Sequence, residues 1–214
     1  RDGRAETAPD ALPYGTYSIK EVLPGEGYLH TDTASRTFRI GIQGQLYRFV
    51  EDDAFFNQVK RGDITFVKTS EDDMARLVGV PFRLTSQTTG ESHVLVTDEN
   101  GRVDTSSAWI AHTQNTNAND AALAPDGTID ATALDMHAGT WFGQTTEGWL
   151  VDVDDGLCAL PYDTYTLEEL RCPANEGLAL VTIKDITIQR DLTKVDLGTI
   201  DDKGPTLAAL FAMK

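Results

Sequence analysis

Two ionisable side chains fall in phase with the apolar faces of their strands, where an isolated charge is costly. Residues 63–68 and 162–169 alternate apolar and polar side chains, and this period of two places one set in the core. Lys68 and Glu169 each extend the inward set of their segment. A buried ammonium or carboxylate destabilises a fold unless it has a partner. The residues alone therefore indicate either a partly buried ion pair or a Lys68 side chain that reaches solvent.

Other arrangements that could carry chemistry are weak. The four histidines lack the spacing of metal ligands, and residues 152–156 resemble a calcium loop without its fifth-position ligand and distal glutamate. Neither a nucleophile elbow nor a phosphate-binding loop occurs. Arg61-Gly62-Asp63 spells an integrin-type tripeptide, but it runs from a linker into a strand. We therefore expect no cofactor, no metal site and no enzyme that turns over a substrate.

Composition narrows the class of partner. The 214 residues are 40% hydrophobic, which is enough for a core, and the formal net charge is −16. Such an acidic chain repels phosphate backbones, so nucleic acid is excluded as an expected partner. No apolar run reaches the roughly 20 residues of a membrane helix. Residues 1–6 lack the apolar segment of a signal peptide, as an excised fragment of a secreted protein also would.

Two cysteines, Cys158 and Cys172, are too few for a disulfide framework. Cys158 precedes the predicted strand at residues 162–169, and Cys172 follows it. The sequence leaves open a single bridge or two free buried thiols.

The elements that position these residues are predicted to be strands. Short runs of β-branched and aromatic residues are separated by Gly, Pro, Asn and Asp, which is typical of a β-sandwich. The predicted strands are residues 16–21, 36–40, 63–68, 93–97, 162–169, 181–189 and 194–200.

An internal repeat divides the chain. Residues 12–21 recur as residues 160–169, and each copy is followed by a proline and then Glu-Gly. A repeat at this spacing indicates that one structural unit occurs twice. The first copy lies so near residue 1 that its unit is expected to lack its early strands. We predict a first unit at 1–61, a complete second unit at 62–200, and a linker or the start of another domain at 201–214.

The second unit contains a polar segment at about 108–155 that does not alternate. A loop this long is uncommon in a compact domain and is often functional. A short helix is predicted within residues 121–136. The favoured interpretation is a polar flap whose tryptophans pack on the edge of the sandwich, and the alternative is a ligand-binding surface around Trp109, Trp141 and Trp149.

The repeated segment resembles the signature strand of the Cna protein B-type, or SpaA-like, domains of Gram-positive pilins and adhesins. The resemblance rests on Leu-Pro-Tyr-Gly-Thr-Tyr-x-Ile-x-Glu at residues 12–21, on residues 60–68 as a junction into a first strand, and on residues 78–86 as a second strand. It implies an all-β, Ig-like or prealbumin-like sandwich in two tandem units, the first truncated and the second carrying the insertion. It also implies display outside the cell on a wall-anchored protein.

The family implies an intramolecular isopeptide bond between a first-strand lysine and a last-strand Asn or Asp, assisted by a glutamate on the signature strand. In the second unit these positions match Lys68 and Glu169, and no Asn follows Asn175. Asp196 is the preferred acceptor and Asp191 the second choice. Such a bond would be a single self-modification, whereas the alternative is the ion pair described above.

In the first unit the resemblance matches Glu21 to the assisting glutamate and Asn57 to the acceptor. Lys20 lies next to Glu21 and therefore points to the opposite face. The partner lysine is absent, so Asn57 is expected to be unlinked.

Two functions follow from the resemblance and the insertion. The first is a structural stalk or spacer whose partners are neighbouring domains of the same surface protein. The second is a binding module that contacts a host extracellular protein or a glycan through the insertion.

Overall fold

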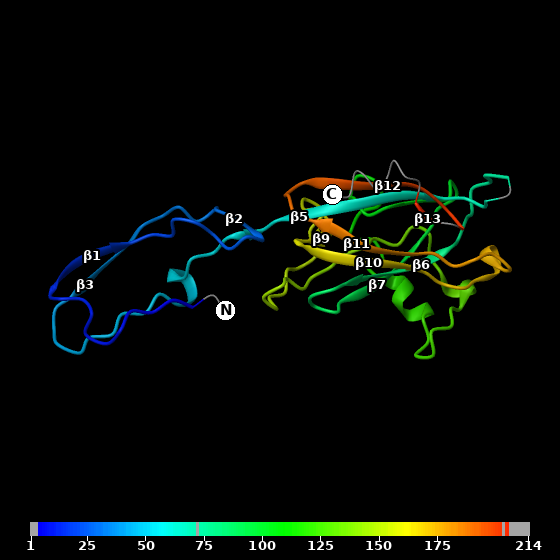
Figure 1. Ribbon diagram of the computed structural model, residues 1–214. Coiled ribbons are helices and arrows are strands. Elements are labelled where there is room, and N and C mark those ends of the chain that lie inside the picture. The colour runs from blue at the N-terminus through cyan, green and yellow to red at the C-terminus, as the bar shows by residue number, and fades with distance from the viewer. Residues whose placement is uncertain (1–3, 72, 203, 206–214) are drawn as a thin grey trace. The chain divides into compact units, whose positions relative to one another are not determined.

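Short strands make up almost all of the regular structure, so the all-β prediction is confirmed (Figure 1). The computed structural model describes residues 4–71, 73–202 and 204–205. The seven predicted strands are present as β1, β3, β5, β7, β10, β11 and β12, with ends shifted by no more than two residues. By its internal contacts the chain divides into two units, residues 1–59 and 60–214.

Two sheets form the second unit. The first sheet is antiparallel and has the order β11-β10-β6-β7. Its strands are β6 (Pro81–Ser86), β7 (Ser92–Val96), β10 (Asp163–Glu169) and β11 (Thr182–Ile188). The second sheet has the order β13-β12-β5-β8, and β9 also pairs with β5. Its strands are β5 (Arg61–Lys68), β8 (Arg102–Asp104), β9 (Leu160–Pro161), β12 (Thr193–Asp201) and β13 (Gly204–Pro205).

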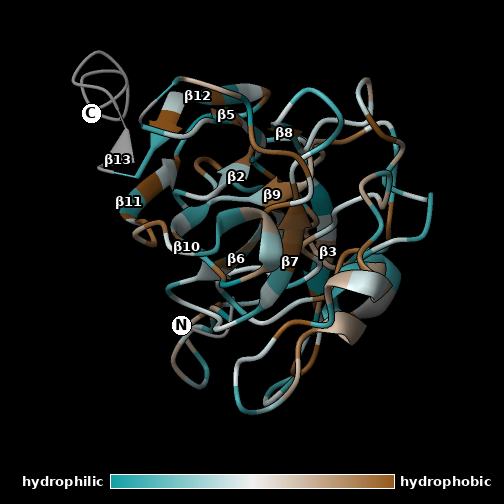
Figure 2. Cartoon of the chain, turned by 90° about the vertical axis from the view of Figure 1, so that its right-hand side faces the viewer, coloured by the Kyte–Doolittle hydropathy of each residue, from teal (hydrophilic) through white to brown (hydrophobic). Residues whose placement is uncertain are grey.

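The core lies between these sheets and follows the alternation of the sequence. Phe66 of β5 meets Phe82 of β6 edge to face, with ring centroids 4.9 Å apart. Leu84, Leu167 and Leu197 from three other inward positions are buried in the same cluster. Figure 2 shows brown, apolar segments on β7, β9, β11 and β12. Burial alternates along β10, as expected for a strand with one face on the core of a two-layer sandwich.

β12 contains an irregularity that changes which of its side chains point inward. Its pairing with β5 is parallel and shifts register between Asp196 and Thr199, around Gly198 at φ 70°. Val195 is buried before the shift, Leu197 is buried within it, and Ile200 is buried after it. An extra residue in a strand reverses the phase of the residues that follow.

The first unit contains two small antiparallel sheets and little closed core. β1 (Gly15–Ile19) pairs with β3 (Arg36–Ile40), and β2 (Tyr28–Leu29) pairs with β4 (Gln58–Val59). Glu51–Asp53 forms a 3-10 turn, η1. Within its described residues, Ile40 and Val59 are the buried hydrophobic side chains. Nine large hydrophobic residues are exposed: Tyr14, Ile19, Val22, Leu23, Ile42, Leu46, Tyr47, Val50 and Phe56.

The repeated segment makes the same local contact in both units. The hydroxyl of Tyr17 donates to the carbonyl of Pro13 at 2.6 Å. The hydroxyl of Tyr165 donates to the carbonyl of Pro161 at 2.7 Å. The sequence repeat therefore corresponds to a repeated backbone conformation at the start of β1 and β10.

The segment between β8 and β9 contains two 3-10 turns, η2 (Ala118–Ala122) and η3 (Ala131–Ala133). The predicted short helix is therefore reduced to single turns. Asn117 before η2 has φ 55°, and Asp130 before η3 caps Thr132, so Asn and Asp side chains favour turns here over a continuous helix. Another such turn, η4 (Pro173–Asn175), follows β10.

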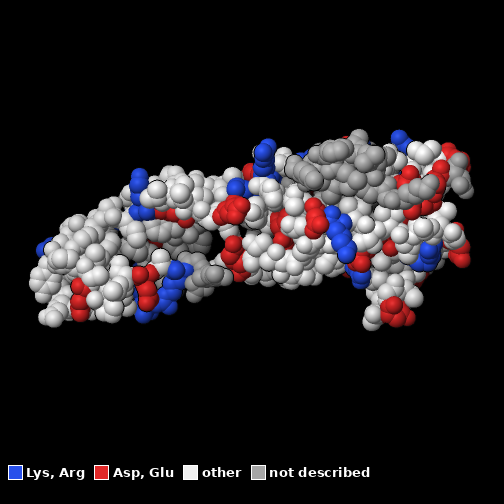
Figure 3. Space-filling model, in the orientation of Figure 1, with Lys and Arg blue, Asp and Glu red and all other residues white. Residues whose placement is uncertain are grey.

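The surface carries charges of both signs. On the face that Figure 3 shows, acidic and basic side chains are interspersed rather than gathered in a basic patch. Within the described ranges, no helix combines the length and apolar character needed to cross a membrane. The predicted linker or next domain beyond residue 205 lies outside the described residues.

We predict that Gly62→Ala destabilises the second unit by about 1–3 kcal/mol, because the strand pairing leaves no room for a methyl group. A Cβ at Gly62 would lie 2.6 Å from the carbonyl oxygen of Thr193 and 3.0 Å from Ile188 Cγ2. Urea unfolding followed by tryptophan fluorescence measures the loss. Gly41→Ala is the control, because the nearest atom to its Cβ would be 4.0 Å away. Equal midpoints for Gly62→Ala and the wild type would show that β5 and β12 are not packed this closely.

Candidate functional site

Lys68, Glu169 and Asp202 form a buried cluster of three charged side chains in the second unit. Lys68 Nζ lies 2.8 Å from Asp202 Oδ1 and 3.4 Å from Glu169 Oε2. The side chains of Lys68 and Glu169 are fully buried, and that of Asp202 is 8% exposed. The structure therefore brings Lys68 and Glu169 together, and Lys68 does not reach solvent.

Glu169 is held in place by its other hydrogen bonds. Asn175 Nδ2 donates to Glu169 Oε1 at 2.9 Å, and the backbone N–H of Val181 donates to Oε2 at 3.2 Å. Asn175 is itself buried, donating to the carbonyl of Leu170 and accepting from the N–H of Cys172. The carboxylate is thus oriented towards Lys68 by Asn175 of η4 and by Val181, the residue before β11.

Neither of the two predicted acceptors, Asp196 and Asp191, lies beside Lys68 in the structure. Asp196 is exposed on β12 and accepts a hydrogen bond from Gly198 N at 2.8 Å. Asp191 accepts from Arg61 N at 3.0 Å, at the opposite end of β5 from Lys68. Asp202 stands beside Lys68 instead, in phase with buried Ile200 after the register shift of β12. The sequence already contained a sign that Asp196 points outward, because it lies between the apolar residues Val195 and Leu197.

Sequence reasoning also missed Asn175. The residue follows the signature strand after the sequence Cys-Pro-Ala, and its role depends on a backbone conformation that alternation does not describe.

The two cysteines are free thiols and do not form the single bridge that the sequence left open. Cys172 is buried and Cys158 is half-buried. Burial, followed by the nearby Asp63 carboxylate, raises the pKa of Cys158 to about 12, which makes it a poor nucleophile.

The first unit places Glu21 and Asn57 together. Asn57 Nδ2 donates to Glu21 Oε2 at 2.5 Å, and Asn57 Oδ1 accepts from Thr31 N at 3.0 Å. Both side chains are half-buried, and Lys20 is exposed. His30 Nε2 lies 3.9 Å from Glu21 Oε2. The structure therefore brings the Asn57 amide and the Glu21 carboxylate into contact, whereas the side chain of Lys20 is exposed and does not join them.

The tripeptide Arg61-Gly62-Asp63 is buried at the start of β5. Arg61 donates to the carbonyls of Cys158, Phe142 and Ala159, each at 2.6 Å, and its guanidinium lies 3.8 Å from the Trp141 ring centroid. Burial lowers the pKa of Arg61 to about 10, so the side chain is still charged at neutral pH. The tripeptide is a structural anchor for the insertion and is inaccessible to a receptor in the folded unit.

The three tryptophans of the insertion occupy different environments. Trp141 is 3% exposed and packs under Arg61, so it cannot contact a ligand. Trp109 and Trp149 are 43% and 67% exposed. Burial thus separates Trp141, which packs in the interior, from Trp109 and Trp149, whose side chains are accessible.

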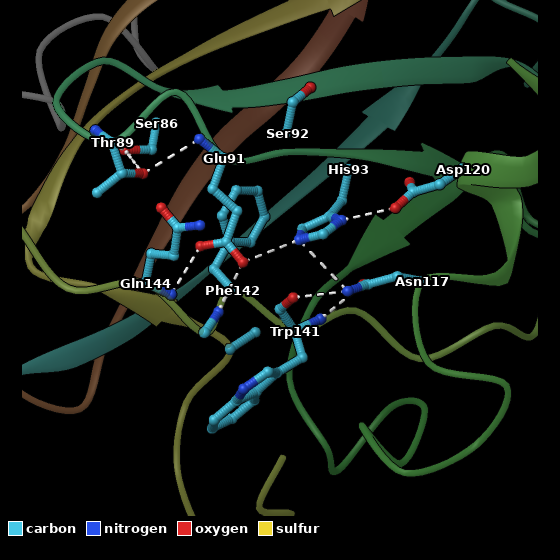
Figure 4. Close-up of polar contacts among 12 residues, drawn as sticks. Ser86, Thr89, Glu91, Ser92, His93, Asn117, Asp120, Trp141, Phe142 and Gln144 are labelled. Carbon is cyan, nitrogen blue, oxygen red and sulfur yellow. Dashed lines mark hydrogen bonds and ion pairs between the residues drawn. The ribbon is translucent and has the colours of Figure 1, made fainter. Parts of the chain in front are cut away.

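A charged cluster fastens the insertion to β7 (Figure 4). His93 Nδ1 lies 2.7 Å from Asp120 Oδ2 of η2, and His93 Nε2 lies 3.2 Å from Glu91 Oε1. Glu91 accepts from the N–H groups of Gly143 and Gln144, both at 2.8 Å. The imidazole also meets the Phe142 ring edge to face. One histidine therefore joins two separate parts of the insertion to the sheet.

The charges around His93 set its protonation state. Burial lowers the pKa of His93, but the hydrogen bonds and charges of Asp120 and Glu91 outweigh burial and raise the pKa to about 9. Burial raises the pKa of Glu91, and the hydrogen bonds from His93, Gln144 and Gly143 bring it below its ordinary value. The cluster is therefore an imidazolium between two carboxylates at neutral pH.

No family model matches the sequence, and no curated protein matches it. Among solved structures, the fold is similar to the Bacillus anthracis TIE protein, with TM-score 0.42 and 16% identity over 87% of this chain and 25% of that one. A streptococcal ancillary pilin has TM-score 0.32 and 20% identity over 87% of this chain and 42% of that chain. GBS52, a minor pilin of Streptococcus agalactiae, has TM-score 0.34 and 13% identity over 90% of this chain and 61% of that chain.

The chain thus spans between a quarter and about three-fifths of the length of these three structures. With TM-scores below 0.5, the similarities assign no function to the chain.

We predict that raising the pH from 7 to 10 removes the stabilisation that charged His93 provides. The folded pKa lies above the ordinary value of 6.5, so this contribution is complete below 6.5 and disappears as the pH rises through about 9. A shift of this size corresponds to at most about 3 kcal/mol of unfolding free energy. The difference in urea stability between the wild type and His93→Gln should therefore be large at pH 7 and small at pH 10.

His137→Gln serves as the control, because His137 and its partner Glu99 are both 56% exposed. An exposed pair contributes little, so this variant should unfold like the wild type at both pH values. A stability gap for His93→Gln that is the same at pH 7 and pH 10 would contradict the assignment of charge to His93.

Proposed function

We propose that this chain is a structural spacer segment of a pilin-like bacterial surface protein, and that its second unit locks itself with an isopeptide bond between Lys68 and Asp202. The observation that carries this proposal is the buried contact of Lys68 with two carboxylates. The resemblance of residues 12–21 and 160–169 to the Cna protein B-type signature strand supports it. The proposal places the protein outside the cell, anchored to the wall, with neighbouring domains of the same protein as its partners.

The bond would form by condensation. The Lys68 nitrogen attacks the Asp202 carboxyl carbon, the new C–N bond forms, and one carboxyl oxygen departs as water. The attacking amine must be unprotonated, and Glu169 lies close enough to accept its proton and return one to the departing oxygen. Contact between the reacting groups in a fixed core replaces an encounter in solution, which supplies a large effective concentration.

Removing a buried ion pair favours this reaction. One ammonium and two carboxylates share a buried site. Condensation would replace the opposite charges of Lys68 and Asp202 by a neutral amide, which removes the cost of keeping this pair out of water and leaves the charge of Glu169 unchanged. By analogy with a disulfide, closing a loop of this length would stabilise the unit by about 4–5 kcal/mol.

The first unit is proposed to use the same chemistry once a further strand is added. Its exposed apolar residues and small sheets indicate a sandwich that needs more strands to close its core. Glu21 and Asn57 already contact each other, as an assisting carboxylate and an amide acceptor would. A lysine on the added strand would complete this set, with ammonia as the leaving group.

A second candidate function is binding through the insertion, to a host protein or a glycan. The exposure of Trp109 and Trp149 favours it, since exposed aromatic side chains are frequent anchors of interfaces. This function is compatible with a spacer role, because the exposed tryptophans and the residues of the proposed cross-link are different side chains.

We predict that the intact mass of the reduced protein is lower than the calculated mass by one water. Lys68→Ala, Asp202→Ala and Glu169→Ala should each restore the full mass, because they remove the nucleophile, the acceptor and the proton carrier. Asp196→Ala is the matched control and should keep the deficit, since Asp196 is exposed and its carboxylate accepts from Gly198 N instead of contacting Lys68. The full calculated mass in the wild type would refute the cross-link.

The leaving group provides a separate test. In Asp202→Asn, the same attack would release ammonia in place of water, so the mass deficit should change by the difference between these two molecules. Peptide mapping should then find residue 68 joined to residue 202. A water deficit that persists unchanged in this variant would mean that another carboxyl group is the acceptor.

The same spectra report on the first unit. An additional loss of ammonia in the wild type would show that Asn57 is already linked, contrary to the expectation that it is unlinked in this chain.

A further inference from the structure

A groove lies where the insertion meets the turn between β7 and β8. It has a volume of about 380 Å³, within the range of small-ligand sites, and its openings face solvent. The turn contributes one wall and two separate parts of the insertion contribute the other. Its lining includes Asp98, Glu99, Asn100, Trp109, Ile110 and His137.

Trp109 forms a fixed aromatic surface in this groove. The guanidinium of Arg102 lies 4.5 Å from the centroid of the indole ring, and Arg102 is in turn held by Asp104 at 2.6 Å. Lys194 also contacts Asp104, at 2.8 Å. The indole is therefore oriented before any ligand arrives, which lowers the entropic cost of binding to it.

Polar groups surround the indole on the turn side. Asp98 Oδ1 accepts from the N–H groups of Asn100 at 2.8 Å and Arg102 at 2.9 Å, which fixes the turn. Glu99 on that turn meets His137 of the insertion at 2.8 Å, and both are more than half exposed. Asn100 is exposed beside them and offers both an amide donor and a carbonyl acceptor.

The charges in the groove discriminate between classes of ligand. The chain's net charge of −16 opposes an anionic ligand. Arg102 already occupies the cation position at the indole, so a second cation on Trp109 would be repelled. Asp98 is buried and holds the backbone amides of the turn, whereas Glu99 is exposed beside His137 and has lone pairs left for hydroxyl donors. A neutral ligand with an apolar face and several hydroxyl groups matches all three conditions.

We infer that this groove binds a neutral saccharide, with one sugar ring stacked on Trp109 and its hydroxyl groups hydrogen-bonded to Glu99, Asn100 and His137. Trp149 lies outside the groove lining, although it is more exposed than Trp109. The site goes beyond the proposed cross-link and is independent of it. It assigns the binding function of the insertion to one tryptophan and one class of ligand.

Binding can be tested with the full chain labelled with ¹⁵N, by titrating lactose, cellobiose, maltose and diacetylchitobiose. At least one of these saccharides should shift the indole N–H signal of Trp109 in a saturable way. Trp109→Ala should weaken its binding by at least about tenfold, as expected for loss of an aromatic anchor. Glu99→Gln, at an exposed position that the fold tolerates, should weaken binding by a smaller factor. Trp149→Ala is the control and should bind like the wild type.

Three outcomes would overturn the inference. The first is that none of the four saccharides shifts the Trp109 signal up to its solubility limit. The second is that binding survives in Trp109→Ala and is lost in Trp149→Ala. The third is that tetralysine, titrated in parallel, binds at Trp109 while the saccharides do not, which would make the occupant a basic peptide. The intact mass of Trp109→Ala should equal the mass expected from the wild-type deficit, so failure here is distinguishable from failure of the cross-link.

Discussion

β5 carries a buried cation at each of its ends, and the groups that contact these two cations come from the opposite sheet, from the insertion and from the segment after β12. At one end, Arg61 is surrounded by three backbone carbonyls and the face of Trp141, so the insertion and β9 must fold against it. At the other end, Lys68 requires Glu169 from the opposite sheet and Asp202 after the last long strand. Removing the partners of either cation would leave a charge out of water, which is among the costliest defects in a core. The alternating apolar residues between them would then be packed around an unsatisfied group.

Alternation predicted the strands well because it reports burial directly. The second carboxylate that contacts Lys68, that of Asp202, instead depends on a local break in the alternation. Lys68 and Glu169 were found because they continue runs of inward residues. Asp202 was missed because Gly198 shifts the phase of β12, so that the inward positions become Ile200 and its second neighbour. A glycine late in a predicted strand is the one signal of such a bulge in the sequence. The glycine alone does not show which of the following residues will point inward. Asn175 lies in a turn, where the sequence pattern carries no information about side-chain direction.

The insertion was the least predictable part because its contacts join residues that no periodicity relates. Glu91, His93 and Asp120 belong to a loop, a strand and a 3-10 turn, and they meet only in the folded unit (Figure 4). The same is true of the groove, where Glu99 and His137 approach each other from the turn between β7 and β8 and from the insertion. The sequence did indicate that the tryptophans matter, but it could not separate the buried Trp141 from the exposed Trp109 and Trp149. One anchors the segment, and the others are left for contacts with solvent or ligand.

The parallel pairing of β5 with β12 has a mechanical consequence. β5 is the first strand of the second unit and β12 is its last long strand, so tension applied to the two ends of the unit acts along neighbouring strands. Parallel neighbours pulled from opposite termini are loaded in shear, in which many hydrogen bonds must break together, rather than unzipped one at a time. Lys68 and Asp202 lie at the C-terminal end of this pairing. A covalent bond there would carry the load from β5 directly to residue 202, and residues 69–201 would not be extended.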